Sequence, residues 1–123
     1  MIVNLTPHPM HIYPPQTPDR ITPGSVNPLL VIAPSAQFPP ARLGQRVIGQ
    51  ERIDGIPVEQ VAFGPAHAHL SLPEPDAGTW YVVALVVGLA APHRDDLLVP
   101  HDYVRDFDGR IIGSRKLARP HRS

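Results

Sequence analysis

The sequence predicts a mainly β fold, a small barrel or sandwich of short strands with at most one short helix. Seventeen of its 123 residues are proline, about three times the average usage of ~5%, and proline interrupts helices and is confined to the edges and ends of strands. Between the prolines lie short runs rich in β-branched residues, and their spacing predicts roughly six to eight strands. The third observation is the end of the chain, where two such runs flank a short Asp/Gly segment in the pattern of a β-hairpin.

The first half of the chain predicts several short strands. Residues Ile2–Thr6 are typical of a strand that ends at Pro7, and Met10–Tyr13 alternate well enough to return as a second strand after a tight turn. Asn27–Ala33 is a short apolar run bounded by prolines, which predicts a third strand. The alternation of apolar and polar residues over Val58–Phe63 predicts another.

The most strand-like run lies in the middle of the second half. Thr79–Leu85 is almost continuously apolar, which favours a central strand buried on both faces. The apolar segment that follows either continues this strand or forms a short helix over Val86–Pro92, ended by the proline. We expect the core of this region to contain Val82, Val83, Leu85, Leu98, Val104 and Ile111.

The closing hairpin is predicted from its two arms and its turn. His101–Arg105 and Arg110–Arg115 are the arms, and Asp106–Gly109 connects them. The carboxylate of Asp106 can accept hydrogen bonds from amides of the turn, and Gly109 can adopt the positive φ that closing it requires. We therefore expect one β-rich domain over residues 1–115, followed by a basic, solvated tail over residues 116–123.

The composition excludes several classes of protein. Eleven basic and eleven acidic residues balance each other, so no overall field draws the protein to nucleic acid or to anionic lipid. Without cysteine there is neither a disulfide framework nor a thiolate site. The start of the chain lacks the pattern of a signal peptide, and the longest apolar run, Tyr81–Ala91, is shorter than the roughly 20 residues that a membrane span needs. These features predict a cytoplasmic protein that binds neither membrane nor nucleic acid.

Seven histidines raise the hypothesis of a metal site. His67 and His69 would lie on one face of a strand, where both could reach one cation, and His8 and His11 are three residues apart. The alternative is that these imidazoles are ordinary surface groups, since a zinc site needs three or four ligands and supporting contacts behind them. No cofactor is predicted.

A second hypothesis places an anionic ligand where the two ends of the chain meet. If the first strand pairs near the last hairpin, His8, Arg94 and Arg105, beside Asp106, would line one polar patch. Arginine forks bind anions bidentately, and a histidine adds a charge that changes near pH ~6.5. The alternative is structural, with Arg94 paired to Asp96 and Arg105 paired to Asp106.

Motifs at both ends of the chain resemble those of a known family. They are Asn4-Leu-Thr-Pro-His8, Thr79-Trp-Tyr-Val-Val83, Arg94-Asp-Asp-Leu-Leu-Val-Pro100, Val104-Arg-Asp106 and Gly109-Arg-Ile-Ile-Gly113. In this pattern the chain resembles a family of small uncharacterised proteins encoded by phages and by filamentous soil bacteria. The resemblance covers both ends and one central strand, and it implies a genomic context and no particular activity.

Taken together, these observations support a non-catalytic binding or interaction protein that is phage-associated. No nucleophile–base motif, P-loop or dinucleotide fingerprint occurs in the sequence. The expected partner is a small anionic ligand or another protein, and pairing of strand edges would make the protein a homo-oligomer. The alternative is a small metal-dependent enzyme that uses the histidines.

Overall fold

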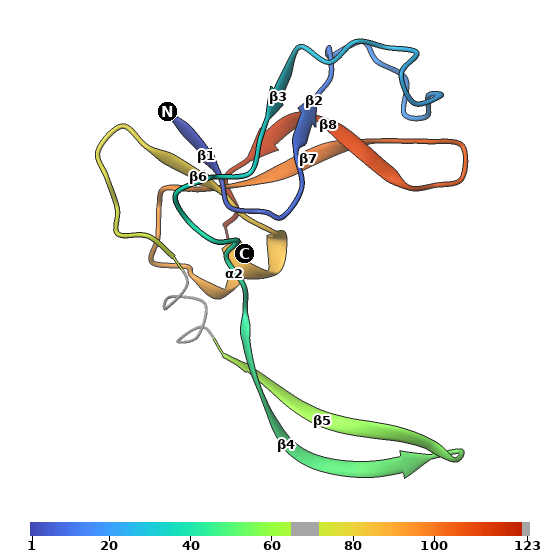
Figure 1. Ribbon diagram of the computed structural model, residues 1–123, viewed down its shortest axis with the longest axis vertical. Coiled ribbons are helices and arrows are strands. Elements are labelled where there is room, and N and C mark those ends of the chain that lie inside the picture. Colours follow the sequence, from blue (N-terminus) through green and yellow to red (C-terminus); the bar gives the residue numbers. More distant parts are fainter. Residues whose placement is uncertain (65–71, 122–123) are drawn as a thin grey trace.

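The computed structural model describes residues 1–64 and 72–121, and these form a mainly β protein as predicted (Figure 1). Six strands make one sheet in the order β1-β6-β7-β8-β2-β3, and two longer strands make a separate hairpin. The sheet consists of β1 (Ile2–Asn4), β2 (Met10–Ile12), β3 (Leu30–Ile32), β6 (Trp80–Val82), β7 (Leu97–Arg105) and β8 (Ile111–Ala118). The hairpin consists of β4 (Gly44–Ile53) and β5 (Ile56–Gly64), and α2 (Leu85–Ala90) is the single helix within the described ranges.

The six-stranded sheet curls into a nearly closed barrel. β1 and β6 pair in parallel, as do β6 and β7, whereas β7 and β8 are antiparallel. β2 lies between β8 and β3. The chain after β3 then returns to β1, where Pro34 bridges Asn4 and the amide of Ser35 donates to the Asn4 carbonyl at 2.9 Å. The first two strands therefore do not pair with each other, contrary to the expectation of a simple return after Pro7.

Asn4 holds this closure together. Its side chain is buried, and its Nδ2 donates to the carbonyls of His8 and Ile32, both at 2.9 Å. Its Oδ1 accepts from the amide of Thr6 at 2.9 Å and from the Thr6 hydroxyl at 2.7 Å. An asparagine that satisfies its amide donors and its acceptor in this way stabilises the turn after β1 and ties it to β3.

The closing hairpin has the predicted structure. Asp106 Oδ1 accepts from the amides of Asp108 and Arg110, both at 2.9 Å, and Gly109 has a φ of +87°. β8 continues to Ala118, three residues into the predicted tail. The guanidinium of Arg119 lies 5.1 Å from the centre of the Trp80 ring, so the tail begins in a strand and then packs on the barrel.

The core differs in part from the sequence prediction. Val82, Val83 and Val104 are fully buried as expected, but Leu85 and Ile111 are 48% and 52% exposed. β6 ends at Val82 and α2 begins at Leu85, so the strand is shorter than the predicted Thr79–Leu85 and its expected last residue is instead the first residue of the helix. The main core cluster is formed by Leu5, Ala41, Leu72, Tyr81, Val83, Val87, Ala91, Leu97 and Val99.

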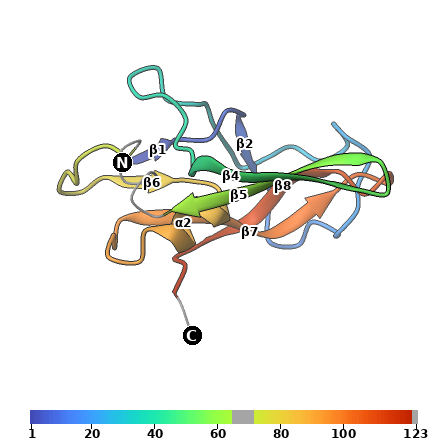
Figure 2. The ribbon, with the colours of Figure 1, turned by 90° about the horizontal axis from the view of Figure 1, so that it is seen from below.

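The hairpin of β4 and β5, residues 44–64, is called the arm below. It projects away from the barrel, and Figure 2 shows it from a second direction. Its two-residue turn is Asp54-Gly55, with φ values of 52° and 78°, and Ile53 pairs with Ile56 across it. Two consecutive residues with positive φ define the turn type that best suits the twist of a β-hairpin.

Across residues 1–64 and 72–121, no helix has the length and apolar content needed to span a membrane.

Candidate functional site

Arg94 forms an ion pair within the chain. Its Nε and Nη2 donate to the two carboxylate oxygens of Asp96 at 2.9 and 2.8 Å, and both side chains are largely buried. The hydrogen bonds that Arg94 donates to the Asp96 carboxylate are the main reason that the pKa of Arg94 is raised above its ordinary value. This fork already binds a carboxylate, as the structural alternative to the ligand hypothesis predicts.

Arg105 and Asp106 serve the closing hairpin. Nη1 of Arg105 donates to the Gly109 carbonyl at 3.0 Å, and the guanidinium lies 5.9 Å from the centre of the Tyr103 ring. Asp106 is buried and accepts the two turn amides described above. The predicted pairing of Arg105 with Asp106 is therefore replaced by contacts that each residue makes with the backbone of the turn.

In the ranges that the structure describes, His8 and the two arginines line no common cavity. His8 lines a cavity of about 410 Å³ beside β2 and β8. Arg105 lines another cavity, together with Asp19, Arg115 and their neighbours, and Arg94 belongs to neither lining. The first strand pairs with β6 and not with the closing hairpin. The second strand reaches that hairpin, where Ile12 of β2 pairs with Ser114 of β8, but this contact does not collect the predicted residues into one cavity.

The cavity beside β2 and β8, called the barrel-mouth cavity below, is mostly apolar. Its lining residues are Thr6, Pro7, His8, Pro9, Met10, His11, Ala84, Leu85, Pro100, Tyr103, Ile111, Ile112, Gly113 and Ser114. Its polar groups are two imidazoles, the phenol of Tyr103 and two hydroxyls. The hydroxyl of Ser114 is buried without a hydrogen-bond partner among the described residues.

For the metal hypothesis, the structure places two histidines at one cavity, but the described residues provide no complete set of metal ligands there. His8 and His11 both line the barrel-mouth cavity, and the His11 ring stacks on Tyr13 with 6.4 Å between ring centres. No group of three or more His, Cys, Asp or Glu side chains close enough for a metal occurs within the described part of the chain. His67 and His69 lie outside the described residues.

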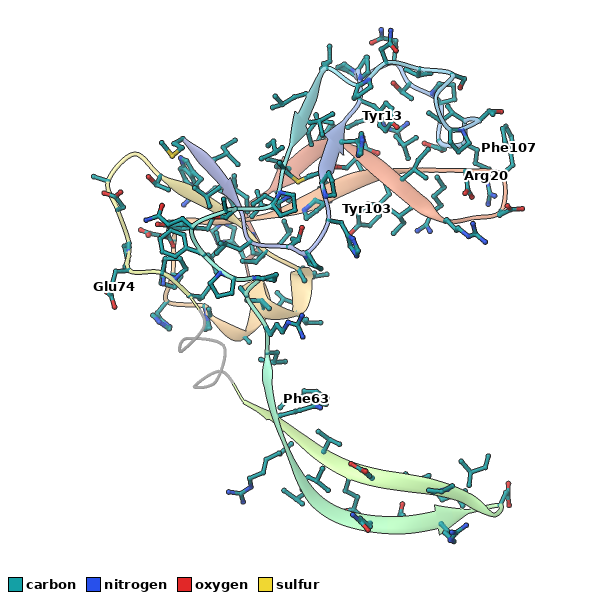
Figure 3. All side chains as sticks on the ribbon, in the orientation of Figure 1. Tyr13, Arg20, Phe63, Glu74, Tyr103 and Phe107 are labelled. Atoms are coloured by element: carbon teal, nitrogen blue, oxygen red, sulfur yellow. The ribbon has the colours of Figure 1, made fainter. Side chains whose placement is uncertain are left out.

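The arm exposes large apolar side chains on both of its faces. Val47, Ile48 and Phe63 are 46%, 58% and 60% exposed, and Ile53 and Ile56 near the turn are 52% and 63% exposed. Figure 3 shows Phe63 on the arm, apart from the side chains of the barrel. Cross-strand partners share a face. Ile48 is an extra residue of β4 without a partner in β5, and it lies between the pair of Val47 with Val61 and the pair of Ile53 with Ile56. These two pairs therefore belong to opposite faces of the arm.

The two long edges of the arm are not equivalent. In a hairpin with a two-residue turn the closing pair, here Ile53 and Ile56, is hydrogen-bonded, and the next pair directs its backbone groups outward. That next pair is Arg52 with Pro57. Proline has no N–H, so the outer edge of β5 lacks a donor at Pro57, whereas the outer edge of β4 has no proline.

The sequence contained a signal for the arm that the strand prediction over Val58–Phe63 did not use. An Asp-Gly pair between β-branched residues is the strongest short-range indication of a hairpin, and Asp54-Gly55 lies between Ile53 and Ile56.

Comparison with family models, with curated proteins and with solved structures found no match for this chain.

Proposed function

We propose that this protein is a non-catalytic interaction protein, and that the partner of its arm is a second copy of the same chain. The observation that carries the proposal is the arm itself, which places exposed apolar residues on a two-stranded hairpin whose contacts are chiefly internal. A two-stranded hairpin is only marginally stable alone in water and gains stability from a further strand or from packing. A second arm supplies both.

The backbone of the arm favours the outer edge of β4 for this pairing. An unpaired strand edge is a template for another strand, and the edge of β5 lacks a donor at Pro57. Two β4 edges placed antiparallel around a two-fold axis would join two arms into a four-stranded sheet. Such an interface uses the same surface on both copies, as two-fold symmetry requires.

The charges of β4 suit one register of this pairing. With the two-fold axis between Ile48 and Gly49, Arg46 of each copy stands opposite Glu51 of the other. Because Ile48 is an extra residue without a cross-strand partner, Arg46 and Glu51 lie on the same face of β4 despite their odd spacing. Facing side chains in a sheet must share a face, and opposite charges there are favourable.

The test is sedimentation equilibrium over a range of protein concentrations. We expect the natural protein to dimerise, and Arg46→Glu or Glu51→Arg to weaken dimerisation about tenfold or more, because each variant sets like charges opposite each other. The double variant Arg46→Glu with Glu51→Arg should restore dimerisation. Glu59→Arg, the same charge change on β5, is the matched control and should leave dimerisation unchanged.

Two outcomes contradict the proposal. One is a natural protein that stays monomeric at every concentration. The other is that the single charge variants weaken dimerisation and the double variant does not restore it, since this would place the interface elsewhere.

The proposal extends to the setting of the protein. The resemblance of its ends to phage-encoded proteins supports an association with phages, and a chain without cysteine suits the reducing cytoplasm. The balanced charge argues against nucleic acid as the partner.

A further inference from the structure

We infer that the barrel-mouth cavity binds a small molecule with an apolar body and a carboxylate or similar anionic group. This inference does not depend on the arm or on self-association. It assigns a second function, ligand binding, to a part of the barrel that the arm does not form.

The cavity has the size and the lining of a small-molecule site. Its volume is about 410 Å³, within the range of roughly 300–1,000 Å³ of sites for small ligands. Its walls come from the turn after β1, from β2, β7 and β8, and from the start of α2. The apolar part is formed by prolines with Met10, Leu85, Ile111 and Ile112, which favour an apolar body.

Close packing at Gly113 holds one wall in place. A Cβ atom at this position would lie 2.5 Å from Cε2 of Tyr13 and 2.7 Å from the carbonyl oxygen of His11. The absence of a side chain therefore lets the backbone at His11 approach β8 closely. The segment that bears His11 and, three residues earlier, His8 is fixed against the sheet by this contact and by the Asn4 hydrogen bond to the His8 carbonyl.

The polar groups of the cavity favour an acceptor on the ligand. Ser114 is 1% exposed, and its buried hydroxyl has no partner among the described residues. A buried hydroxyl without a hydrogen bond is costly. The Ser114 hydroxyl lies just beneath the cavity surface, so a small movement of the side chains above it would let a ligand oxygen accept from it. Tyr103, directly opposite Ser114 in the sheet, contributes a second hydroxyl donor.

The ionisable groups of the cavity decide the sign of the ligand charge. No Asp or Glu is among the lining residues, and the two imidazoles of His8 and His11 can donate hydrogen bonds or carry positive charge. A cationic ligand would find no counter-charge in this lining, whereas a carboxylate would find donors. The inference therefore excludes amines and favours aromatic or aliphatic carboxylates.

The probes are 2-naphthoate and its neutral counterpart 2-naphthalenemethanol, measured by isothermal titration calorimetry on the full chain. We expect naphthoate to bind at submillimolar concentration and the alcohol to bind at least tenfold more weakly. Ser114→Ala should weaken naphthoate binding several-fold, because it removes the hydroxyl and leaves the cavity open. Ile111→Trp should abolish binding by filling the cavity from an exposed position.

Leu29→Trp is the matched control, because Leu29 is also exposed but does not line the cavity. It should leave binding unchanged. The inference is overturned if naphthoate does not bind at millimolar concentration, if the alcohol binds equally well, or if Ile111→Trp binds as the natural protein does. A thermal melt checks that each variant folds. If one variant does not fold, changes in the NMR chemical shifts of Ser114 and Gly113 in the natural protein still locate the ligand.

Discussion

Arg115 ties three segments of the chain together. From β8 its guanidinium donates to the Thr17 carbonyl and to the Asp19 carboxylate in the loop after β2. It also donates to Asp102 at 2.8 Å and to the Tyr103 carbonyl at 3.3 Å, both in β7. The hydrogen bond from Arg115 is the main reason that the pKa of Asp102 is lowered from its ordinary value of 3.8.

This contact predicts how stability changes in acid. A lowered pKa in the folded state means that the ionised carboxylate of Asp102 stabilises the fold, fully above pH 3.8 and progressively less as the pH falls through the folded pKa. Asp102→Asn should therefore be less stable than the natural protein at pH 7, and the difference between the two free energies of unfolding should shrink as the pH falls below 3.8. Asparagine tolerates the φ of 61° at this position, so the substitution adds little backbone strain.

Urea denaturation from pH 7 to pH 2 measures this difference. In an Arg115→Gln background, Asp102→Asn should have a much smaller effect, because the hydrogen-bond partner of Asp102 is already absent and the more distant Lys116, at 3.8 Å, remains in both proteins. A difference between natural protein and variant that stays constant down to pH 2 would contradict the assignment.

At the scale of elements, local patterns predicted what is local in the structure. The closing hairpin and the short helix near Val86 depend on neighbouring residues; the hairpin was predicted, and the helix was one of the two alternatives for its segment. The parallel pairs of Ile2 with Trp80 and of Ile12 with Ser114 join segments far apart in the chain, and no alternation pattern encodes such partners. The arm was only half predicted, because Pro57 and the many polar residues of β4 weakened the strand pattern.

The two edges of the arm give a direct test of which strand associates. Gln50 and Glu59 are cross-strand partners, two pairs further from the turn than Arg52 and Pro57. Hydrogen-bonded and outward-directed pairs alternate along the hairpin, so Gln50 and Glu59 also direct their N–H groups outward. Gln50→Pro removes a donor from the edge of β4, and Glu59→Pro removes the equivalent donor from β5. We expect Gln50→Pro to raise the dimer dissociation constant at least tenfold and Glu59→Pro to leave it nearly unchanged, as measured by sedimentation equilibrium.

Circular dichroism of both variants provides the control that the hairpin still forms. If Glu59→Pro dissociates the dimer and Gln50→Pro does not, β5 is the associating edge and the proposed register is wrong.

At the scale of the whole molecule, the sequence raised the hypothesis that the first strand pairs near the last hairpin, and it could not predict which side chains would meet there. β2 and β8 are neighbours, but Arg94 lies with Asp96 and Arg105 lies with the hairpin turn. Of the predicted ligand-binding residues, His8 alone lines the barrel-mouth cavity. The direction of a side chain depends on register and closure of the barrel, which are set by the long-range pairs.

The division into barrel and arm predicts that the barrel folds without the arm. Gly44 and Gly64 are cross-strand partners, so their Cα atoms lie only about 5 Å apart and a short Gly/Ser linker can replace residues 45–63. None of the replaced residues belongs to the main core cluster, and the lining of the barrel-mouth cavity is likewise retained. We expect this shortened chain to melt cooperatively, within about 5 °C of the natural protein compared as monomers, since the buried apolar contacts of the barrel are unchanged. It should be monomeric at every concentration and should still bind 2-naphthoate. A shortened chain that fails to fold would show that the arm supports the barrel, and one that still dimerises would move the interface from the arm to the barrel.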